Sequence, residues 1–315
     1  MDWALDLFHM LVFPGFLFLA AFSLLAEYVD RKLHATLQNR VGPPWFQPWA
    51  DLLKLAGKEE LLPEQADTTM FRLVPLVAMA AVVTAFFYIP IWGPTALFAF
   101  QGDVIVVLYL LTIPTVTFFL AGWYSRSVFS MIGAARNVLQ LFAYEIPLFL
   151  AILAPALLAG TWSLSEMAEW YGRHPGYTAL NVIGLAVALM ALLGKLERVP
   201  FDIPEAETEI VAGSFTEYSG RLLAMFRLAI NIEMVVGAAL LAAVFLPFGL
   251  GLGPVVGFVL FLVKVMGIVA ALSLFRTVFA RLRIDQMINF CWKIAAPVAL
   301  LQLLIDLVAK GTFAR

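Results

Sequence analysis

An acidic run between residues 197 and 217 holds the side chains best suited to chemistry. Its six carboxylates are Glu197, Asp202, Glu205, Glu207, Glu209 and Glu217. Pro204 suits the first turn of a helix and Asp202 suits its cap. We therefore expect a helix from about Pro204, with Glu205 and Glu209 on one face. Where water is scarce, two such carboxylates raise each other's pKa, as a proton relay requires. The alternative is a solvated acidic loop.

Five further charged residues interrupt long apolar runs of the sequence. They are Glu145, Arg227, Glu233, Lys264 and Lys293. A charge at the centre of a bilayer costs at least about 2.5–3.5 kcal/mol, so such residues usually face a bundle interior or a wet cavity. We predict functional burial for Glu145, Glu233 and Lys264. For Arg227 and Lys293 the alternative is snorkelling to the interface or structural pairing.

The elements that position these residues must lie in a membrane. The chain has 315 residues, of which 63% are hydrophobic and 13% are charged, against roughly 45–50% and ~25% in soluble domains. Apolar runs broken by charge, Pro and Gly predict an all-α membrane protein with eight spans in a single transmembrane domain, residues 1–315. The predicted spans are 7–25, 73–90, 104–122, 138–158, 180–196, 222–246, 255–275 and 288–308.

The distribution of Lys and Arg predicts how these spans are oriented. Fourteen of them fall in or beside the segments 26–72, 123–137, 197–221 and 276–287, whereas the intervening loops contain Arg173 alone. The positive-inside rule places the basic segments in the cytoplasm and both termini outside. The formal net charge of −2 gives no indication of a nucleic-acid partner.

The first cytoplasmic segment contains the pattern of a short amphipathic helix. Trp49, Leu52, Leu53 and Ala56 recur at helical spacing, with charged residues between them. We expect this helix either to lie in the membrane interface or simply to cover the bundle.

Cysteine and histidine usage excludes a metal or redox centre built by this chain alone. Cys291 is the single cysteine, and His9, His34 and His174 lie far apart without ligand spacing. Neither an iron–sulfur cluster nor a structural zinc site can form from these residues. Any redox centre is therefore expected on a partner.

Charged residues on the predicted cytoplasmic side are candidates for docking a partner protein. They are Arg40, Arg126, Arg136, Arg198, Arg281, Arg283 and Asp285. Anchoring to lipid headgroups is the alternative function for such clusters.

Several motifs, in order along the chain, resemble those of a known family. They are NRVGP at 39–43, Gly133-Ala134 with Arg136, Glu145, RVPFDIPEAETE at 198–209, TEYSG at 216–220 and RIDQ at 283–286. Together they are similar to the H-type membrane subunit of respiratory complex I, which also occurs in energy-converting hydrogenases.

The resemblance implies a helical subunit that binds the redox arm of an ion-translocating complex on its cytoplasmic face. Its implied partners are a hydrophilic iron–sulfur subunit, a large hydrogenase-like subunit, and antiporter-like and small membrane subunits in the cell membrane. Iron–sulfur clusters, and in the hydrogenase branch a nickel–iron site, would be carried by those partners. The acids at Glu205, Glu207 and Glu209 would lead toward Glu145 and Glu233 as a proton path. Asp202, Glu217 and Lys264 complete the predicted coupling residues.

The branch within this family rests on finer features of the sequence. The segment Asp30-Arg31-Lys32 and the compact linker 279–283 look more like hydrogenase-type or ferredoxin-driven complexes than like NADH-quinone oxidoreductase. Quinone binding is expected only in the second branch, where this subunit forms part of the quinone cavity. Two other hypotheses are a stand-alone ion or solute carrier and a purely structural anchor.

Overall fold

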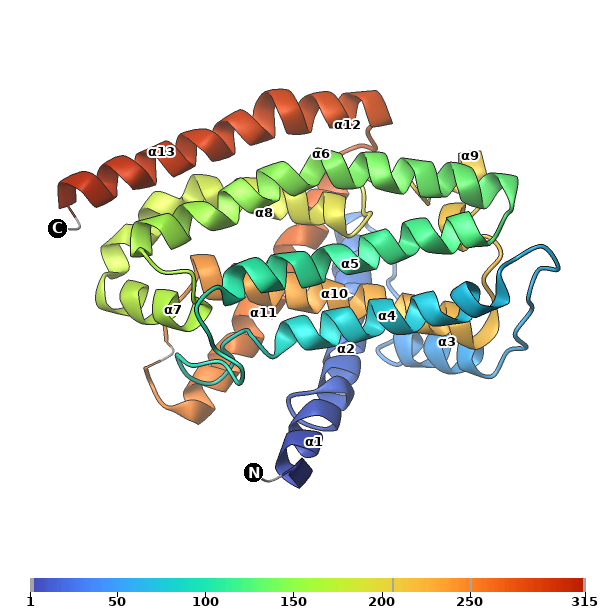
Figure 1. Ribbon diagram of the computed structural model, residues 1–315, viewed down its shortest axis with the longest axis horizontal. Coiled ribbons are helices and arrows are strands. Elements are labelled where there is room, and N and C mark those ends of the chain that lie inside the picture. The colour runs from blue at the N-terminus through green and yellow to red at the C-terminus, as the bar shows by residue number, and fades with distance from the viewer. Residues whose placement is uncertain (1–2, 206, 250, 314–315) are drawn as a thin grey trace.

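The computed structural model describes residues 3–205, 207–249 and 251–313, and all regular structure in these ranges is helical, as predicted. The helices, shown in Figure 1, are α1 (Trp3–Leu11), α2 (Phe16–Leu37), α3 (Gln47–Ala56), α4 (Thr68–Phe86), α5 (Asp103–Tyr124), α6 (Val128–Ala159), α7 (Leu164–Arg173), η1 (Pro175–Asn181), α8 (Val182–Lys195), α9 (Glu207–Ile210), η2 (Gly213–Phe215), α10 (Gly220–Phe245), α11 (Pro254–Val278), α12 (Ile284–Phe290), η3 (Cys291–Ala295) and α13 (Ala296–Phe313).

Eight helical stretches of the described chain are long and apolar enough to cross a bilayer, as predicted. The stretch from Leu7 to Leu37 combines α1 and α2, and the stretch from Ile284 to Thr312 combines α12, a π-helical turn (η3) and α13. The chain is therefore an integral membrane protein. Figure 1 places α3, α9 and the turn between α5 and α6 at one end of the bundle, called the α3 end. The opposite end, which carries α7 and the end of α13, is called the α7 end.

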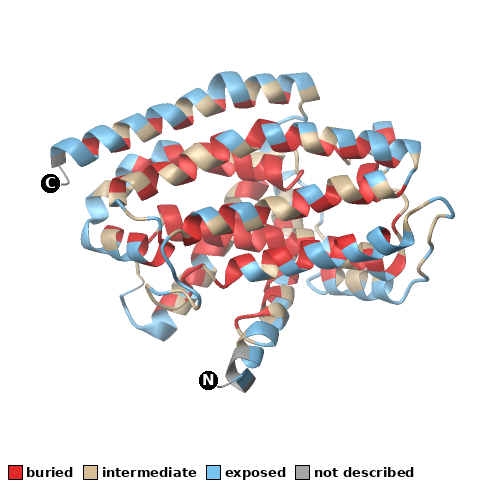
Figure 2. Cartoon of the chain, in the orientation of Figure 1, coloured by how far each residue is buried: buried red, intermediate tan, exposed pale blue. Residues whose placement is uncertain are grey.

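Helix α10 forms the centre of the bundle. Its residues from Ile232 to Phe245 are all buried, and Figure 2 shows this helix in the buried interior. A helix stretch that other helices bury on every side has no face toward lipid or water. The charge that α10 carries at Glu233 must therefore lie inside protein.

Residues 123–137 were predicted to form a loop between two spans, but most of them are helical. Helix α5 continues to Tyr124, and α6 begins at Val128, ten residues before the predicted span at 138. The residues before 138 are less apolar, so a prediction based on hydrophobic runs did not detect this part of the helix. At about 1.5 Å per residue, the 32 residues of α6 exceed the thickness of a ~30 Å hydrocarbon core, so α6 must tilt or project from it.

The helix expected from Pro204 is also wrong, because only the single turn of α9 is present. The preceding backbone is a series of turns and bends, with Phe201 and Ile203 buried and the Gln140 amide donating to the carbonyls of Gly194 and Phe201. Glu205 therefore precedes the helix and does not share a helical face with Glu209. Gly213, with φ +52°, closes this segment: a Cβ there would lie 1.9 Å from the Pro204 carbonyl oxygen.

The amphipathic helix predicted after the first span is present as α3. Trp49 and Leu53 are exposed, whereas Leu52 and Leu55 line a cavity between α3 and the bundle. Helix α3 thus presents apolar side chains both to its surroundings and to the interior.

We predict that Gly133→Ala weakens the contact between α6 and the acidic segment. A Cβ at Gly133 would lie 2.5 Å from the Ser214 backbone nitrogen, and overpacking of this kind typically costs about 1–3 kcal/mol. The thermal unfolding midpoint of the purified complex should fall. Gly172→Ala is the control, because no described atom outside the neighbouring backbone of α7 lies within 4 Å of its Cβ position. Equal midpoints for both variants would contradict the prediction.

Candidate functional site

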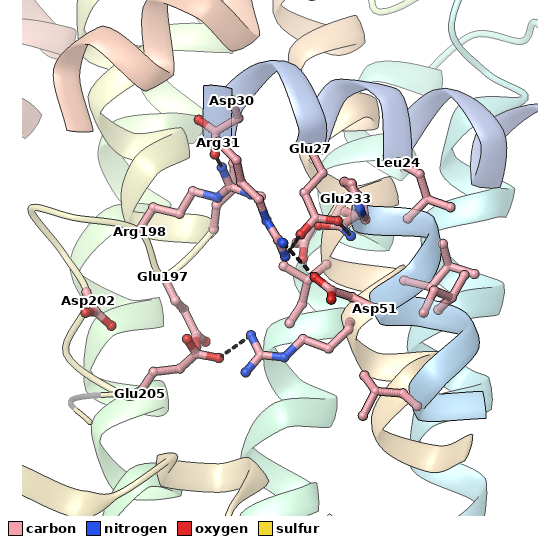
Figure 3. A pocket seen from close by; sticks show the side chains of 18 of the residues that line it. Leu24, Glu27, Asp30, Arg31, Asp51, Glu197, Arg198, Asp202, Glu205 and Glu233 are labelled. Atoms are coloured by element: carbon pink, nitrogen blue, oxygen red, sulfur yellow. Dashed lines mark hydrogen bonds and ion pairs between the residues drawn. The ribbon is translucent and has the colours of Figure 1, made fainter. Parts of the chain in front are cut away.

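A cavity of about 760 Å³ opens between α2, α3, α10 and the segment 196–205. Charged side chains form more than half of its lining, and Figure 3 shows ten of the lining residues labelled. Acids from four separate parts of the chain meet there, including Glu27, Asp51, Glu197 and Glu233. The lining makes the cavity suited to water and charge within an otherwise apolar bundle.

One wall of the cavity is an ion-pair network that joins α2 to α3 and α10. Arg31 pairs with Glu27 one turn before it and donates to Asp51 of α3 at 2.8 Å. Asn231 of α10 donates to the second oxygen of Glu27 at 2.5 Å. Burial acts to raise the pKa of Asp51, but hydrogen bonds from Arg31 and Gln47 outweigh it and lower that pKa.

A second buried cluster fixes the start of the acidic segment to the bundle. Asp30 is 1% exposed, and its Oδ2 atom accepts from both Arg198 and Arg276. Arg276 lies 2.9 Å from that oxygen. The cluster therefore connects α2, α11 and the segment that follows α8, which holds the predicted docking residue Arg198 inside the molecule.

The predicted acids of the loop are separated by the structure. Glu205 pairs with Arg227 of α10 at 3.0 Å, which makes Arg227 a paired residue. Glu209 is exposed and lies 2.7 Å from Arg136. The hydrogen bond from Arg136 and the positive charge of Arg136 lower the pKa of Glu209. Asp202 lines the cavity.

Of the remaining two loop acids, the structure describes the side chain of Glu217 alone. Glu217 is half-buried and is not among the residues that line the cavity. Glu207 opens α9, but its side chain lies outside the described residues.

Glu197 emerges as a central residue that the sequence did not single out within the acidic run. Its side chain is 8% exposed, and Figure 3 shows its carboxylate directed toward that of Glu205. Burial raises the pKa of Glu197 well above its ordinary value, and the negative charges of Glu205, Glu233 and Asp202 raise it further. The pKa of an acid so placed is sensitive to the charges beside it.

The deepest element of the site is the ion pair between Lys195 and Glu233. Each side chain is 1% exposed, and Lys195 Nζ lies 3.2 Å from Glu233 Oε1. Lys195 also donates to the Leu111 carbonyl and lies over the Tyr144 ring. Neither Glu233 oxygen is in hydrogen-bonding geometry with a described donor. The pair is thus held by charge more than by directed hydrogen bonds.

Lys195 was not predicted from the sequence as a site residue, because it counted among the cytoplasmic cations. It ends the apolar helix α8, so its position suggested a surface anchor. The uninterrupted apolar face that precedes it was the available signal that the side chain continues into the bundle.

The two remaining residues predicted within the membrane differ in their relation to this pair. Glu145 is half-buried on α6 and interacts electrostatically with Lys195. Lys264 is buried, but it donates to the Phe248 carbonyl and lies 4.2 Å from the Phe248 ring centre. Among the described residues no carboxylate pairs with Lys264, so the structure does not bring it together with Glu233.

The other predicted docking residues occupy the surface of the α3 end. Arg40, Arg126, Arg281, Arg283 and Asp285 are exposed. Arg136 is engaged by Glu209, and Arg283 lies 3.5 Å from Asp285. Lys293, the remaining charge predicted within a span, is exposed on η3.

Comparison with known proteins assigns the family. The model of the family described as NADH dehydrogenase matches residues 9–307. The chain belongs to the NADH dehydrogenase family. One relative is the H-type membrane subunit of the NADH-quinone oxidoreductase of Carboxydothermus hydrogenoformans, 34% identical over 92% of this chain and 85% of the relative. Another is the corresponding subunit, numbered 8, of the NADH-quinone oxidoreductase of Thermus thermophilus, 35% identical over 96% of this chain and 86% of the relative.

A solved structure with the same fold comes from another respiratory complex. A chain of the archaeal membrane-bound sulfane sulfur reductase superposes with a TM-score of 0.83 and 27% identity, covering 92% of this chain and 96% of that chain. The chain described here is therefore a membrane subunit of a complex-I-like respiratory assembly. The expected preference for a hydrogenase-type assembly is not confirmed, since the relatives above are subunits of NADH-quinone oxidoreductases.

We predict that Lys195→Met destabilises the protein strongly, and that adding Glu233→Gln restores much of the loss. Removing one partner of a buried ion pair costs about 3–5 kcal/mol, because the other charge is left without compensation. Thermal unfolding of the purified complex measures both variants. A double variant no more stable than Lys195→Met would contradict this account of the pair.

We predict that Glu197→Gln stabilises the protein increasingly as pH rises. Since the pKa of Glu197 is raised in the folded state, the folded protein binds the proton more tightly than the unfolded chain does. The cost of ionising this residue is absent below the ordinary glutamate pKa of about 4.3 and grows as pH rises toward the raised value. Unfolding midpoints at pH 5 and pH 8 should show the larger gain at pH 8; equal gains would contradict a raised pKa for Glu197.

Proposed function

We propose that this chain couples electron transfer in its partner subunits to ion translocation across the membrane. The observation that carries the proposal is the continuous row of ionisable groups from the cavity into the bundle. Asp202, Glu205, buried Glu197 and Glu233 all line the cavity, and Glu233 pairs with Lys195, which lies in the bundle beside it. Such groups inside a membrane protein usually mark an ion path.

The physical step is a change in proton occupancy driven by a neighbouring charge. The α3 end exposes Arg40, Arg126 and Arg281, which suit the acidic surface of a redox subunit. Iron–sulfur clusters would belong to that subunit and to a large partner beside it. An electron arriving near the cavity makes ionisation of Glu197 less favourable, so Glu197 takes up a proton. Redistribution of charge at the Glu233–Lys195 pair then extends the effect toward Glu145.

The cavity supports a second part of the proposal, the binding of a quinone headgroup. Its volume of about 760 Å³ accommodates a small ring. The relatives named above are NADH-quinone oxidoreductase subunits that share 34–35% of their residues with this chain, which favours this branch over the hydrogenase branch. The chain's own polar groups would hold the ring, while Leu52 and Leu55 of α3 offer an apolar contact.

The branch is tested on the native complex that co-purifies with this chain. We expect no stoichiometric nickel and a quinone reductase activity that depends on an intact cavity. Nickel at one atom per complex, with hydrogen evolution, would instead assign the hydrogenase branch.

We predict that Glu145→Gln lowers the number of ions translocated per electron in proteoliposomes, while the complex still assembles and transfers electrons. The amide keeps the size of the side chain but cannot change its proton occupancy. Glu169→Gln on the exposed surface of α7 is the matched control, because Glu169 pairs only with exposed Arg173 among the described residues. An unchanged ratio in Glu145→Gln would remove this residue from the path.

The stand-alone carrier makes the opposite prediction. It expects the isolated chain to transport ions in liposomes without partners, whereas coupling to electron transfer requires the complex. Transport by the isolated chain would overturn the proposal.

A further inference from the structure

The last helix carries a polar pair on the face that it buries. Along α13 the buried positions are Ala299, Gln302, Asp306 and Ala309, while the face that includes Leu304 and Leu307 is exposed. Both Gln302 and Asp306 are 0% exposed. A surface helix of a bundle would ordinarily fill such a stripe with apolar side chains, and a carboxyl group there needs a partner or a function.

The hydrogen bonds around this pair run in one direction. Gln302 Nε2 donates to Asp306 Oδ1 at 2.9 Å and to Asn181 Oδ1 at 3.4 Å. Asn181 Nδ2 donates to the Tyr171 hydroxyl at 2.8 Å, which donates to the Pro155 carbonyl at 3.1 Å. With Asn181 Oδ1 as an acceptor, turning the Gln302 amide over would place two acceptor oxygens together, so the orientation described here fits both neighbours of Gln302.

Two buried acceptors remain without a donor in this arrangement. They are Asp306 Oδ2 and Gln302 Oε1, neither of which has a hydrogen-bond partner among the described residues. A buried carboxylate without a donor or a countercharge is costly. Asp306 Oδ2 therefore needs either a hydrogen-bond donor or a bound proton.

The charged groups nearby do not supply this compensation. Lys310, one turn farther along α13, donates its ammonium hydrogen to the Leu157 carbonyl at 2.7 Å. The neighbouring stretches 147–159 of α6 and 182–194 of α8 contain no charged residue, and η1 contributes only Tyr177 as a titratable group. Tyr171 of α7 faces Asp306, but burial raises the pKa of this phenol, which keeps its proton.

We propose that Asp306 binds a proton and extends the proposed ion route to the α7 end of the bundle. A proton on Oδ2 converts an orphan acceptor into a donor and removes the buried charge. A metal ion would need several converging oxygen ligands, and the described residues form no cluster of three or more acidic, His or Cys side chains. Figure 1 places this part of α13 at the same end of the bundle as α7, opposite the end that carries the cavity, so the site is separate from the acid row.

The role in ion translocation rests on the proposed function, whereas the bound proton follows from the site alone. Infrared spectroscopy of the intact complex at neutral pH tests the proton. Asp306→Asn should remove a deuterium-sensitive carboxylic C=O band, and Asp306→Glu should restore it at a shifted frequency. If Asp306→Asn instead removes a carboxylate band, Asp306 is ionised and the proposal is overturned. Loss of the C=O band from the native complex when sodium replaces choline at constant pH would also overturn it, because the site would then bind sodium.

Asp103→Asn provides the matched control for the infrared experiment. Asp103 is an equally buried acid at the α7 end, but its oxygens accept from the Leu164 nitrogen at 2.6 Å and the Ser163 hydroxyl at 3.2 Å. Its substitution should leave the C=O band in place. If Asp306→Asn fails to assemble, Gln302→Leu should shift the same band by removing the donor to Oδ1, and an unshifted band would contradict the proposal.

Proteoliposomes test the role in the ion route. Asp306→Asn should lower the ions translocated per electron while electron transfer continues, and Asp306→Glu should recover the ratio. A normal ratio in Asp306→Asn, together with a lowered ratio in Glu145→Gln, would overturn the role of Asp306 alone. Normal ratios in both variants would instead contradict the proposed function itself.

Discussion

The buried ion pair between Lys195 and Glu233 is the constraint around which the site is arranged. Two opposite charges, each 1% exposed, are held 3.2 Å apart inside an apolar bundle. In such surroundings the pair is sensitive to any further charge, because little solvent screens it. Glu233 lines the cavity together with Asp202 and Glu197, so in the proposed function a charge change at the cavity acts on the interior through this pair.

The architecture around the pair fixes these charges and leaves room for water beside them. The clusters centred on Asp30 and Arg31 attach the acidic segment and α3 to the bundle. The close approach of Gly133 to the backbone at 213–214 holds that segment against α6. These attachments surround the cavity without filling it. In the proposed function, a change of charge at these titratable groups, rather than a large movement, carries the effect into the bundle.

Much of this organisation could be predicted from the sequence, and the failures have physical causes. Apolar runs revealed eight spans because each must cover the thickness of a bilayer. They did not reveal the start of α6, whose first turns are less apolar, or the burial of Lys195, which stands at the end of such a run. The predicted helix at Pro204 failed because contacts far along the chain, from Gln140 and Gly213, hold that backbone. Local sequence cannot report such contacts.

The central claim is that arrival of an electron changes the proton occupancy of the buried acid row. Proton uptake on reduction, measured with a pH indicator in the solubilised complex, tests it most directly. The account predicts uptake in the native complex and reduced uptake when Glu197 is replaced by Gln, with the partners' redox centres reduced to the same extent. Identical uptake in the two complexes would contradict it.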